Sequence, residues 1–177
     1  PEERHAHAAV DALSLTENAL LTAWWRPDLT RLGLISWRQA RAFANQIIKR
    51  FDVRGGDVHT PAWRLSGGNL QKFVAGREIL QQPRVLVVAQ PTWGLDAGAA
   101  AAIREALSEL AARAVAIVLI SQDLDELLAL SDRLAILNGG RLSPALATAE
   151  ADIEQLGLLM GGLHDLGEPQ FAHASGH

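Results

Sequence analysis

The sequence predicts an α/β fold in which a mostly parallel sheet is flanked by helices. Two continuous apolar runs that are rich in β-branched residues, 85–89 and 116–120, have the pattern of strands covered on both faces. An alanine-rich stretch over about 98–113 separates them and is long enough for a helix. A third apolar run, 133–137, continues the alternation, and strands that alternate with helices of this length are typical of a parallel sheet.

The composition is that of a globular protein of about one domain. Of 177 residues, 49% are apolar and 20% are charged. The net charge of −4 does not favour nucleic-acid binding, which normally needs a basic face. Because the chain has no cysteine, it cannot form disulfides or thiolate metal sites, and no other metal-ligand pattern stands out. The chain starts with Pro1 rather than methionine, so we expect a piece of a longer protein.

The first third of the chain indicates helices. A short amphipathic stretch lies at 16–21, and Ser36-Trp37-Arg38-Gln39 has the form of a capping box, in which a hydroxyl and a glutamine satisfy the first amides of a helix. That helix should continue to about Phe51, with apolar residues at helical spacing. Gly55-Gly56 and Pro61 make 52–64 a loop.

The remaining elements follow in order. A helix begins near Gly67 and must stop before Pro83, and the alanine-rich helix should be capped by Asp96. A short helix is expected over 125–130, a tight turn at Gly139-Gly140, and a last helix over 153–160.

The strongest local feature is Leu65-Ser66-Gly67-Gly68-Asn69, followed by Gln71 and Lys72. A serine and two glycines at the start of a helix leave backbone N–H groups, a hydroxyl and the positive end of the helix dipole facing outward. This arrangement suits an anion, because glycine lets a ligand approach the backbone closely. The alternative is a glycine-rich loop that only caps a helix.

The motifs that follow this segment, in this order and spacing, carry a resemblance. The strand 85–89 runs into Gln90-Pro91-Thr92-Trp93-Gly94-Leu95-Asp96, and the strand 116–120 ends at Ser121-Gln122. The series resembles the signature motif, Walker B strand, D-loop and switch loop of the nucleotide-binding domain of ABC transporters. With 128–133, it is most similar to the second half of tandem ATPases that energise bacterial importers of sugars or nucleosides.

The resemblance implies a partial P-loop NTPase (ABC ATPase) fold with a helical signature subdomain. Residues 1–82 would form that subdomain, and 83–147 the part of the α/β core with the Walker B strand, D-loop and switch loop. Residues 148–177 would form a C-terminal helix and a flexible tail.

Four departures from the family pattern affect the chemistry. No Gly-x-x-x-x-Gly-Lys-Ser/Thr loop occurs in the sequence, and Ala89 stands where the magnesium-binding aspartate would be. The positions of the catalytic glutamate and the switch histidine hold Gln90 and Gln122, which form hydrogen bonds but do not take up protons. We therefore expect that this chain alone does not turn over ATP.

The resemblance implies that the chain acts on nucleotide bound elsewhere. Its ATP-binding residues would contact ATP held by a partner half, and they are Ser66, Gly67, Gly68, Asn69, Gln71 and Asp96. ATP and Mg2+ would be cofactors of the assembled transporter. The implied partners are an N-terminal nucleotide-binding half or second ATPase subunit, permease subunits and, indirectly, a solute-binding protein. The chain would lie on the cytoplasmic face of the membrane.

Other interpretations of the sequence remain open. The same fold without its chemistry could serve as a regulatory or dimerisation module, and an ABC ATPase that acts on nucleic acid is disfavoured by the acidic net charge. We expect Trp24-Trp25 to pack in the core, with a contact to a membrane-spanning partner as the alternative. Without a Walker A strand, the sheet should expose apolar surface and unpaired edges.

Overall fold

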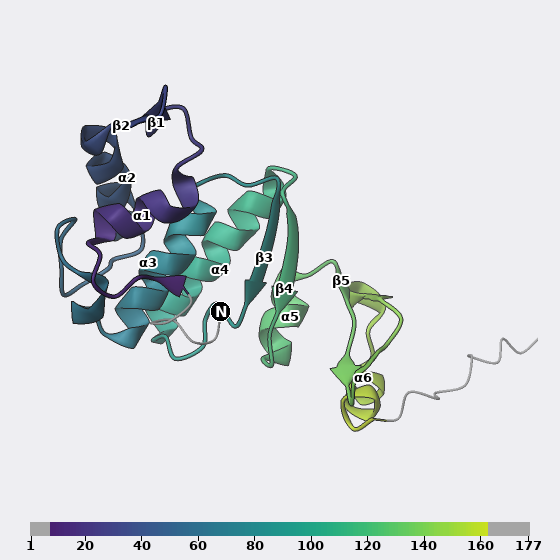
Figure 1. The fold of residues 1–177 in the computed structure, drawn as a ribbon. Helices are drawn as coiled ribbons and strands as arrows, with labels where there is room; N and C mark the ends of the chain where they lie inside the picture. Colours follow the sequence, from purple (N-terminus) through teal and green to yellow (C-terminus); the bar gives the residue numbers. More distant parts are fainter. Residues whose placement is uncertain (1–7, 163–177) are drawn as a thin grey trace, which may run out of the picture. The chain divides into compact units, whose positions relative to one another are not determined.

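The structure, a computed structural model, describes residues 8–162 of the chain (Figure 1). The chain divides into two compact units, one that ends at Leu124 and one that begins at Asp125. Each unit is described by itself below. None of the helices among the described residues is both long enough and apolar enough to span a lipid bilayer.

Helices make up most of the first unit, and they form the elements that the sequence predicts. In chain order the unit contains α1 (Leu15–Ala23), β1 (Thr30–Arg31), β2 (Leu34–Ile35), α2 (Trp37–Arg50), the 3-10 turn η2 (Ala62–Arg64), α3 (Gly67–Ile79), β3 (Val85–Ala89), α4 (Ala97–Ala112) and β4 (Ala116–Ile120). Strands β1 and β2 form a short antiparallel hairpin. The α/β class is therefore confirmed.

The capping box lies at the first helix rather than the second. Ser14 Oγ accepts from the N–H of Glu17, and Glu17 Oε2 accepts in return from the N–H of Ser14 at 2.7 Å. The Ser14 hydroxyl also donates to Glu17 Oε2 at 2.6 Å, and this bond, together with that from the Ser14 N–H, lowers the pKa of Glu17. Ser36 does precede α2, but its side chain makes no capping bond, so the predicted capping box there is wrong.

Strands β3 and β4 pair in parallel, with Val85 opposite Ala116 and Ala89 opposite Ile120. Figure 1 shows α3 and α4 on one side of the two strands, and Leu86, which belongs to that side, is buried. Val87 on the opposite face is 65% exposed and Val118 beside it 51% exposed. The prediction that both faces are covered is therefore wrong, and the exposed apolar surface that we expected is present.

Over its described residues, 125–162, the second unit contains no strand of the parallel sheet. Its elements are α5 (Leu124–Leu130), which starts one residue before the unit, β5 (Arg133–Leu134), β6 (Leu137–Asn138), β7 (Arg141–Leu142), β8 (Leu146–Ala147), the 3-10 turn η3 (Thr148–Glu150) and α6 (Ile153–Met160). The run 133–137 is not the single third strand that we predicted, because β5 pairs antiparallel with β8 and β6 with β7. Gly139 and Gly140 turn the chain with positive φ angles of 55° and 77°, and α6 has the predicted bounds.

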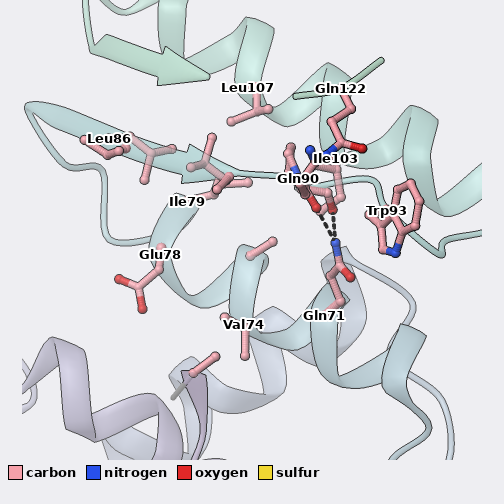
Figure 2. Close-up of a pocket in the computed structure, with 16 residues that line it drawn as sticks. Gln71, Val74, Glu78, Ile79, Leu86, Gln90, Trp93, Ile103, Leu107 and Gln122 are labelled. Carbon is pink, nitrogen blue, oxygen red and sulfur yellow. Dashed lines mark hydrogen bonds between the residues drawn. The ribbon is translucent and has the colours of Figure 1, made fainter. Parts of the chain in front are cut away.

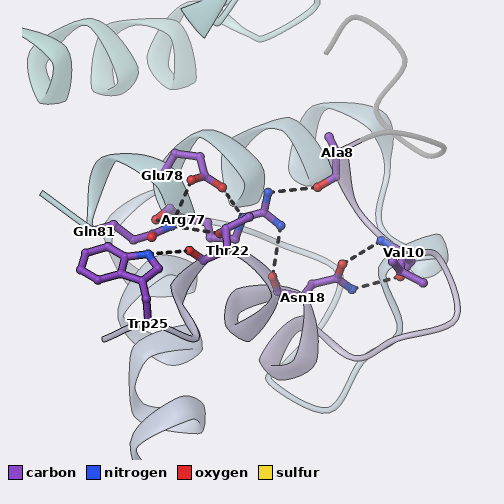
Figure 3. A network of polar contacts seen from close by, with 8 residues as sticks. All are labelled: Ala8, Val10, Asn18, Thr22, Trp25, Arg77, Glu78 and Gln81. Atoms are coloured by element: carbon purple, nitrogen blue, oxygen red, sulfur yellow. Dashed lines mark hydrogen bonds and ion pairs between the residues drawn. The ribbon is translucent and has the colours of Figure 1, made fainter. Parts of the chain in front are cut away.

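A buried arginine connects the helices of the first unit (Figure 3). Arg77 on α3 is 4% exposed and donates to the carbonyls of Asn18 and Ala8, each at 3.1 Å. Asn18, itself fully buried, exchanges hydrogen bonds with the backbone of Val10. The guanidinium also meets Glu78 at 2.7 Å. Arg77 thus ties α3 to α1 and to the chain before it.

The contact between α2 and α3 requires glycine at position 76. A Cβ atom built on Gly76 would overlap the ring of Phe51, whereas one on Gly68 in the same helix would sit at an ordinary 3.7 Å from its nearest neighbours. We therefore expect Gly76→Ala to lower the free energy of unfolding by about 1–3 kcal/mol through overpacking. Gly68→Ala should leave the free energy of unfolding unchanged or raise it. Urea denaturation of the 177-residue chain, followed by circular dichroism, compares the two variants.

All five tryptophans lie at the surface of the first unit. Trp24 is 65% exposed and Trp25 is 57% exposed, so the prediction that this pair packs in the core is wrong. They lie at the end of α1, whose buried side is formed by smaller residues such as Leu15 and Ala19. Leu32 and Leu34 at the neighbouring β1–β2 hairpin are also exposed, at 94% and 76%. Residues 21–37 therefore present an apolar surface, which we call the hairpin surface.

Candidate functional site

The candidate site starts with the N-cap of α3. Ser66 Oγ accepts two hydrogen bonds from Asn69, one from its backbone N–H at 3.4 Å and one from its side-chain Nδ2 at 2.9 Å. Asn69 Oδ1 accepts from the backbone N–H of Arg54 at 2.8 Å. Because a backbone N–H can only donate, this bond fixes which end of the Asn69 amide is oxygen and which is nitrogen.

The two bonds from Asn69 determine what the Ser66 hydroxyl offers to a ligand. Both lone pairs of Oγ are used, so the exposed hydroxyl has only its proton left to give. The group therefore acts as a donor toward solvent and suits an acceptor such as a phosphate oxygen. The positive end of the α3 dipole also favours a negatively charged ligand.

Two glycines widen this donor site. Gly67 is the first residue of α3 and Gly68 the second. A Cβ atom on Gly68 would point toward Gly94 O and Leu95 Cδ2, both 3.7 Å away. The start of α3 therefore lies against the segment 90–96, which the sequence analysis assigned to the D-loop. Because neither glycine carries a side chain, a ligand oxygen could approach this backbone closely.

Gln90 and Gln122 lie where the two parallel strands end. Gln90 follows β3, its N–H donates to Ile120 O at 2.8 Å, and Gln122 follows β4. Both line a cavity of about 570 Å³ between α3, α4 and β3, together with Gln71 and Trp93 (Figure 2). The strand ends carry amides that form hydrogen bonds but cannot act as general bases near neutral pH.

Gln71 is buried rather than open to a ligand. It is 7% exposed, and its Nε2 donates to Gln90 O at 2.9 Å and to Pro91 O at 2.5 Å. Its Oε1 has no hydrogen-bond partner among the described residues. The side chain thus connects α3 to the end of β3, which places it behind the surface of Ser66 rather than on it.

Asp96 caps α4, as predicted, with its Oδ1 accepting from the N–H of Ala99 at 2.9 Å. This bond lowers the pKa of the Asp96 carboxyl below its ordinary value, so the group is charged at neutral pH. Arg54, whose backbone N–H binds Asn69, also forms an ion pair with Asp52 at 2.7 Å. The side-chain hydrogen bond from Arg54 lowers the pKa of the Asp52 carboxyl.

The structure brings the predicted site residues into two adjoining groups within the first unit. One group is the N-cap and partly exposed first turn of α3, formed by Ser66, Gly67, Gly68 and Asn69, and the other is Gln90 and Gln122 at the strand ends. Gln71 joins the two groups. Sequence reasoning missed Arg54, whose backbone N–H orients Asn69 from 15 positions away. No side-chain pattern could have indicated it, because only its main chain takes part.

The residues fit the phosphate part of ATP better than they fit Mg2+. Ser66 and the first N–H groups of α3 offer donors, whereas Ala89 offers no side-chain oxygen at the end of β3. Among residues 8–162, no group of three or more histidine, aspartate or glutamate side chains could hold a metal ion. A magnesium ion would need its ligands from elsewhere.

The chain is similar in sequence to curated import proteins. It is 35% identical over 162 residues to the nucleoside import ATP-binding protein NupA of Lactococcus lactis, a match that covers 92% of this chain and 32% of that protein. It is 38% identical over 162 residues, with the same shares, to the guanosine import ATP-binding protein NupO of Bacillus subtilis. The chain thus spans about a third of the length of the curated relatives it matches. No protein-family model matches it.

The fold is that of known ABC cassettes. A dimeric bacterial ABC transporter cassette superimposes with a TM-score of 0.68 at 20% identity, over 79% of this chain and 59% of that one. A likeness at this identity shows the fold, and the curated relatives add the sequence relationship. Together they show that the chain is homologous to curated import ATP-binding proteins over 92% of its length and has the fold of an ABC ATPase cassette.

Proposed function

We propose that this chain is the C-terminal, second nucleotide-binding half of a tandem ATP-binding protein that energises a bacterial importer of simple sugars or nucleosides. The observation that carries the proposal is the donor geometry of Ser66, whose hydroxyl proton is directed to an outside acceptor by Asn69. The names of the relatives support the solute class, since they import nucleosides and guanosine. In this proposal 1–82 is the signature subdomain, 83–147 the Walker B part and 148–177 the C-terminal part.

The mechanism assigns ATP and its Mg2+ to the partner half. The Ser66 hydroxyl and the N–H groups at Gly67 and Gly68 bind the γ-phosphate of that ATP, and the α3 dipole stabilises its charge. ATP supplies the phosphoanhydride bond that is hydrolysed, and this chain contributes donors without moving a proton. Asp96 lies at the same interface through its place at the start of α4.

The second composite site, on this half, does not hydrolyse ATP. Gln90 and Gln122 are neutral amides at the positions where a base and a switch residue would act. The two halves would therefore have unequal roles. One composite site would hydrolyse ATP, and the other would close around nucleotide without hydrolysing it.

The transporter would place this half at the cytoplasmic face of the membrane, against permease subunits and in indirect contact with a solute-binding protein. The hairpin surface, which includes Trp24, Trp25 and Leu32, is proposed as the permease contact, because large exposed apolar patches mark interaction sites. A solute-binding protein acts on the permease and needs no contact with this chain.

Gly68→Ala tests the proposal in an importer assembled from the longer parent protein and its permease subunits. We expect ATP turnover to fall by at least about tenfold, because the added methyl group would occupy the space between the start of α3 and Gly94-Leu95, beside which the phosphate is proposed to bind. The stability of the chain should not fall, since the new Cβ makes only ordinary contacts. Turnover is measured as released phosphate, and stability by circular dichroism.

A calorimetric titration of the 177-residue chain with Mg-ATP is the control. We expect no binding, because the chain offers donors for a phosphate that another half must hold. Micromolar binding would contradict the assignment of Ser66 to Gly68 as contacts made only to a partner's ATP. Unchanged turnover in the Gly68→Ala importer would instead favour a module that works without nucleotide.

A further inference from the structure

The buried Gln71 is the residue that connects the two groups of the candidate site. Both of its Nε2 hydrogens are used, one by the carbonyl of Gln90 and one by the carbonyl of Pro91. Carbonyls only accept, so the orientation of this amide is settled by its partners.

The backbone that Gln71 holds is strained. Gln90 has a φ of +49°, a left-handed conformation that costs a residue with a side chain about 1–3 kcal/mol and persists only where the surroundings enforce it. Three contacts enforce it here. The N–H of Gln90 is bound to β4 at Ile120, and the two carbonyls that follow are bound to Gln71.

Helix α3 also contacts the turn 90–96 at a second place. Gly68, three residues before Gln71, lies against Gly94 and Leu95, and the turn closes on itself through the N–H groups of Trp93 and Leu95. The start of α3 and the turn 90–96 are therefore in contact at two places, through the hydrogen bonds of Gln71 and through the packing of Gly68 against Gly94 and Leu95. Figure 2 shows Gln71 bonded to the backbone at Gln90, so a movement of α3 at Gln71 would be passed to Gln90 as long as these hydrogen bonds hold.

We propose that Gln71 is a positioning residue that couples the donor surface at Ser66 to the strand end at Gln90. Nucleotide bound at one composite site would thereby set the geometry of the other through α3. This inference rests on the proposed function, in which Ser66 and Gln90 belong to two different ATP sites. It assigns no contact between Gln71 and ATP and so replaces the direct binding role that the sequence suggested.

Gln71→Met tests the coupling, because methionine has a similar length and no donor. In the assembled importer we expect kcat for ATP to fall about tenfold while KM stays within about twofold, since the contact with ATP is kept and only its alignment is lost. Gln81→Met is the matched control. Gln81 follows α3, and its Nε2 donates to Thr22 Oγ1 at 2.9 Å, so the change removes the same kind of amide donor without removing a hydrogen bond to the carbonyls of Gln90 and Pro91.

The control separates positioning from general loss of stability. If both variants lower kcat equally, or if Gln71→Met leaves kcat unchanged, the inference is wrong. If Gln71→Met has no effect while blocking Ser66 abolishes turnover, only the inference fails. If neither change affects turnover, the proposed function fails as well.

Hydrogen exchange on the unaltered 177-residue chain gives a test that needs no folded variant. The amides of Trp93 and Leu95, bonded within the turn, should open with the same free energy as the amide of Leu70, bonded to Ser66 O in α3. Exchange of the turn amides more than about tenfold faster than that of Leu70 would overturn the coupling.

Discussion

Ser66→Arg is expected to abolish ATP turnover in the assembled importer, with a loss of at least about 100-fold. The change removes the hydroxyl donor and puts a long cation where the γ-phosphate of the partner's ATP must fit, and loss of one such donor alone can cost about 100–1,000-fold. Binding of ATP to the other half should be nearly unchanged. Phosphate release and equilibrium binding of a fluorescent ATP analogue measure the two quantities separately.

The loss cannot come from unfolding alone. Ser66 caps α3, and loss of such a cap costs about 1 kcal/mol, well below the stability of a typical domain. Ser66→Ala removes the same cap without the bulk and should keep more turnover than Ser66→Arg. Gln46→Arg adds the same charge to an exposed position on α2 and should leave turnover unaffected. Normal turnover in Ser66→Arg would disprove the role in trans.

Arg77→Met is expected to have the largest effect on stability, a loss of about 3 kcal/mol. Methionine fills similar space but leaves the carbonyls of Asn18 and Ala8 without their charged donor, and hydrogen bonds to charged groups contribute about 1.5–3 kcal/mol each. The ion pair with Glu78 adds less, because Glu78 is 35% exposed. For a chain of this size the change corresponds to a fall in Tm on the order of 10 °C, measured by circular dichroism.

Arg113→Met is the matched control for this experiment. Arg113 is exposed at the end of α4, so its loss should change the free energy of unfolding by no more than about 0.5 kcal/mol. Equal melting temperatures for the two variants would show that the buried network around Arg77 does not hold α1 to α3.

The elements whose ends are set by local chemistry could be predicted from the sequence. Helix α3 starts at the Ser66 cap and ends before Pro83, α4 starts at the Asp96 cap, and α6 has its predicted bounds. The two capping candidates show the limit of such reasoning. Ser14 with Glu17 and Ser36 with Gln39 share the same pattern, yet only the first pair forms the box.

The features that depend on distant partners could not be predicted. The run 133–137 has strand character, but its pairing with 142–147 rather than with the parallel sheet depends on register, which an apolar run does not encode. In the site, the sequence indicated Ser66 to Gly68 but not the amide of Arg54 that orients Asn69. It indicated Gln71 but placed it on the ligand side rather than behind the helix.

The surface position of every tryptophan decides what the intrinsic fluorescence of this chain can report. The least exposed of the five, Trp37, is still 47% exposed, so the indoles are already in water in the folded state. Unfolding would change their emission little, whereas a partner that covers the hairpin surface would move Trp24 and Trp25 into an apolar environment and shift the emission to shorter wavelength. Tryptophan emission is therefore a signal of association for this chain, and folding must be followed by other means.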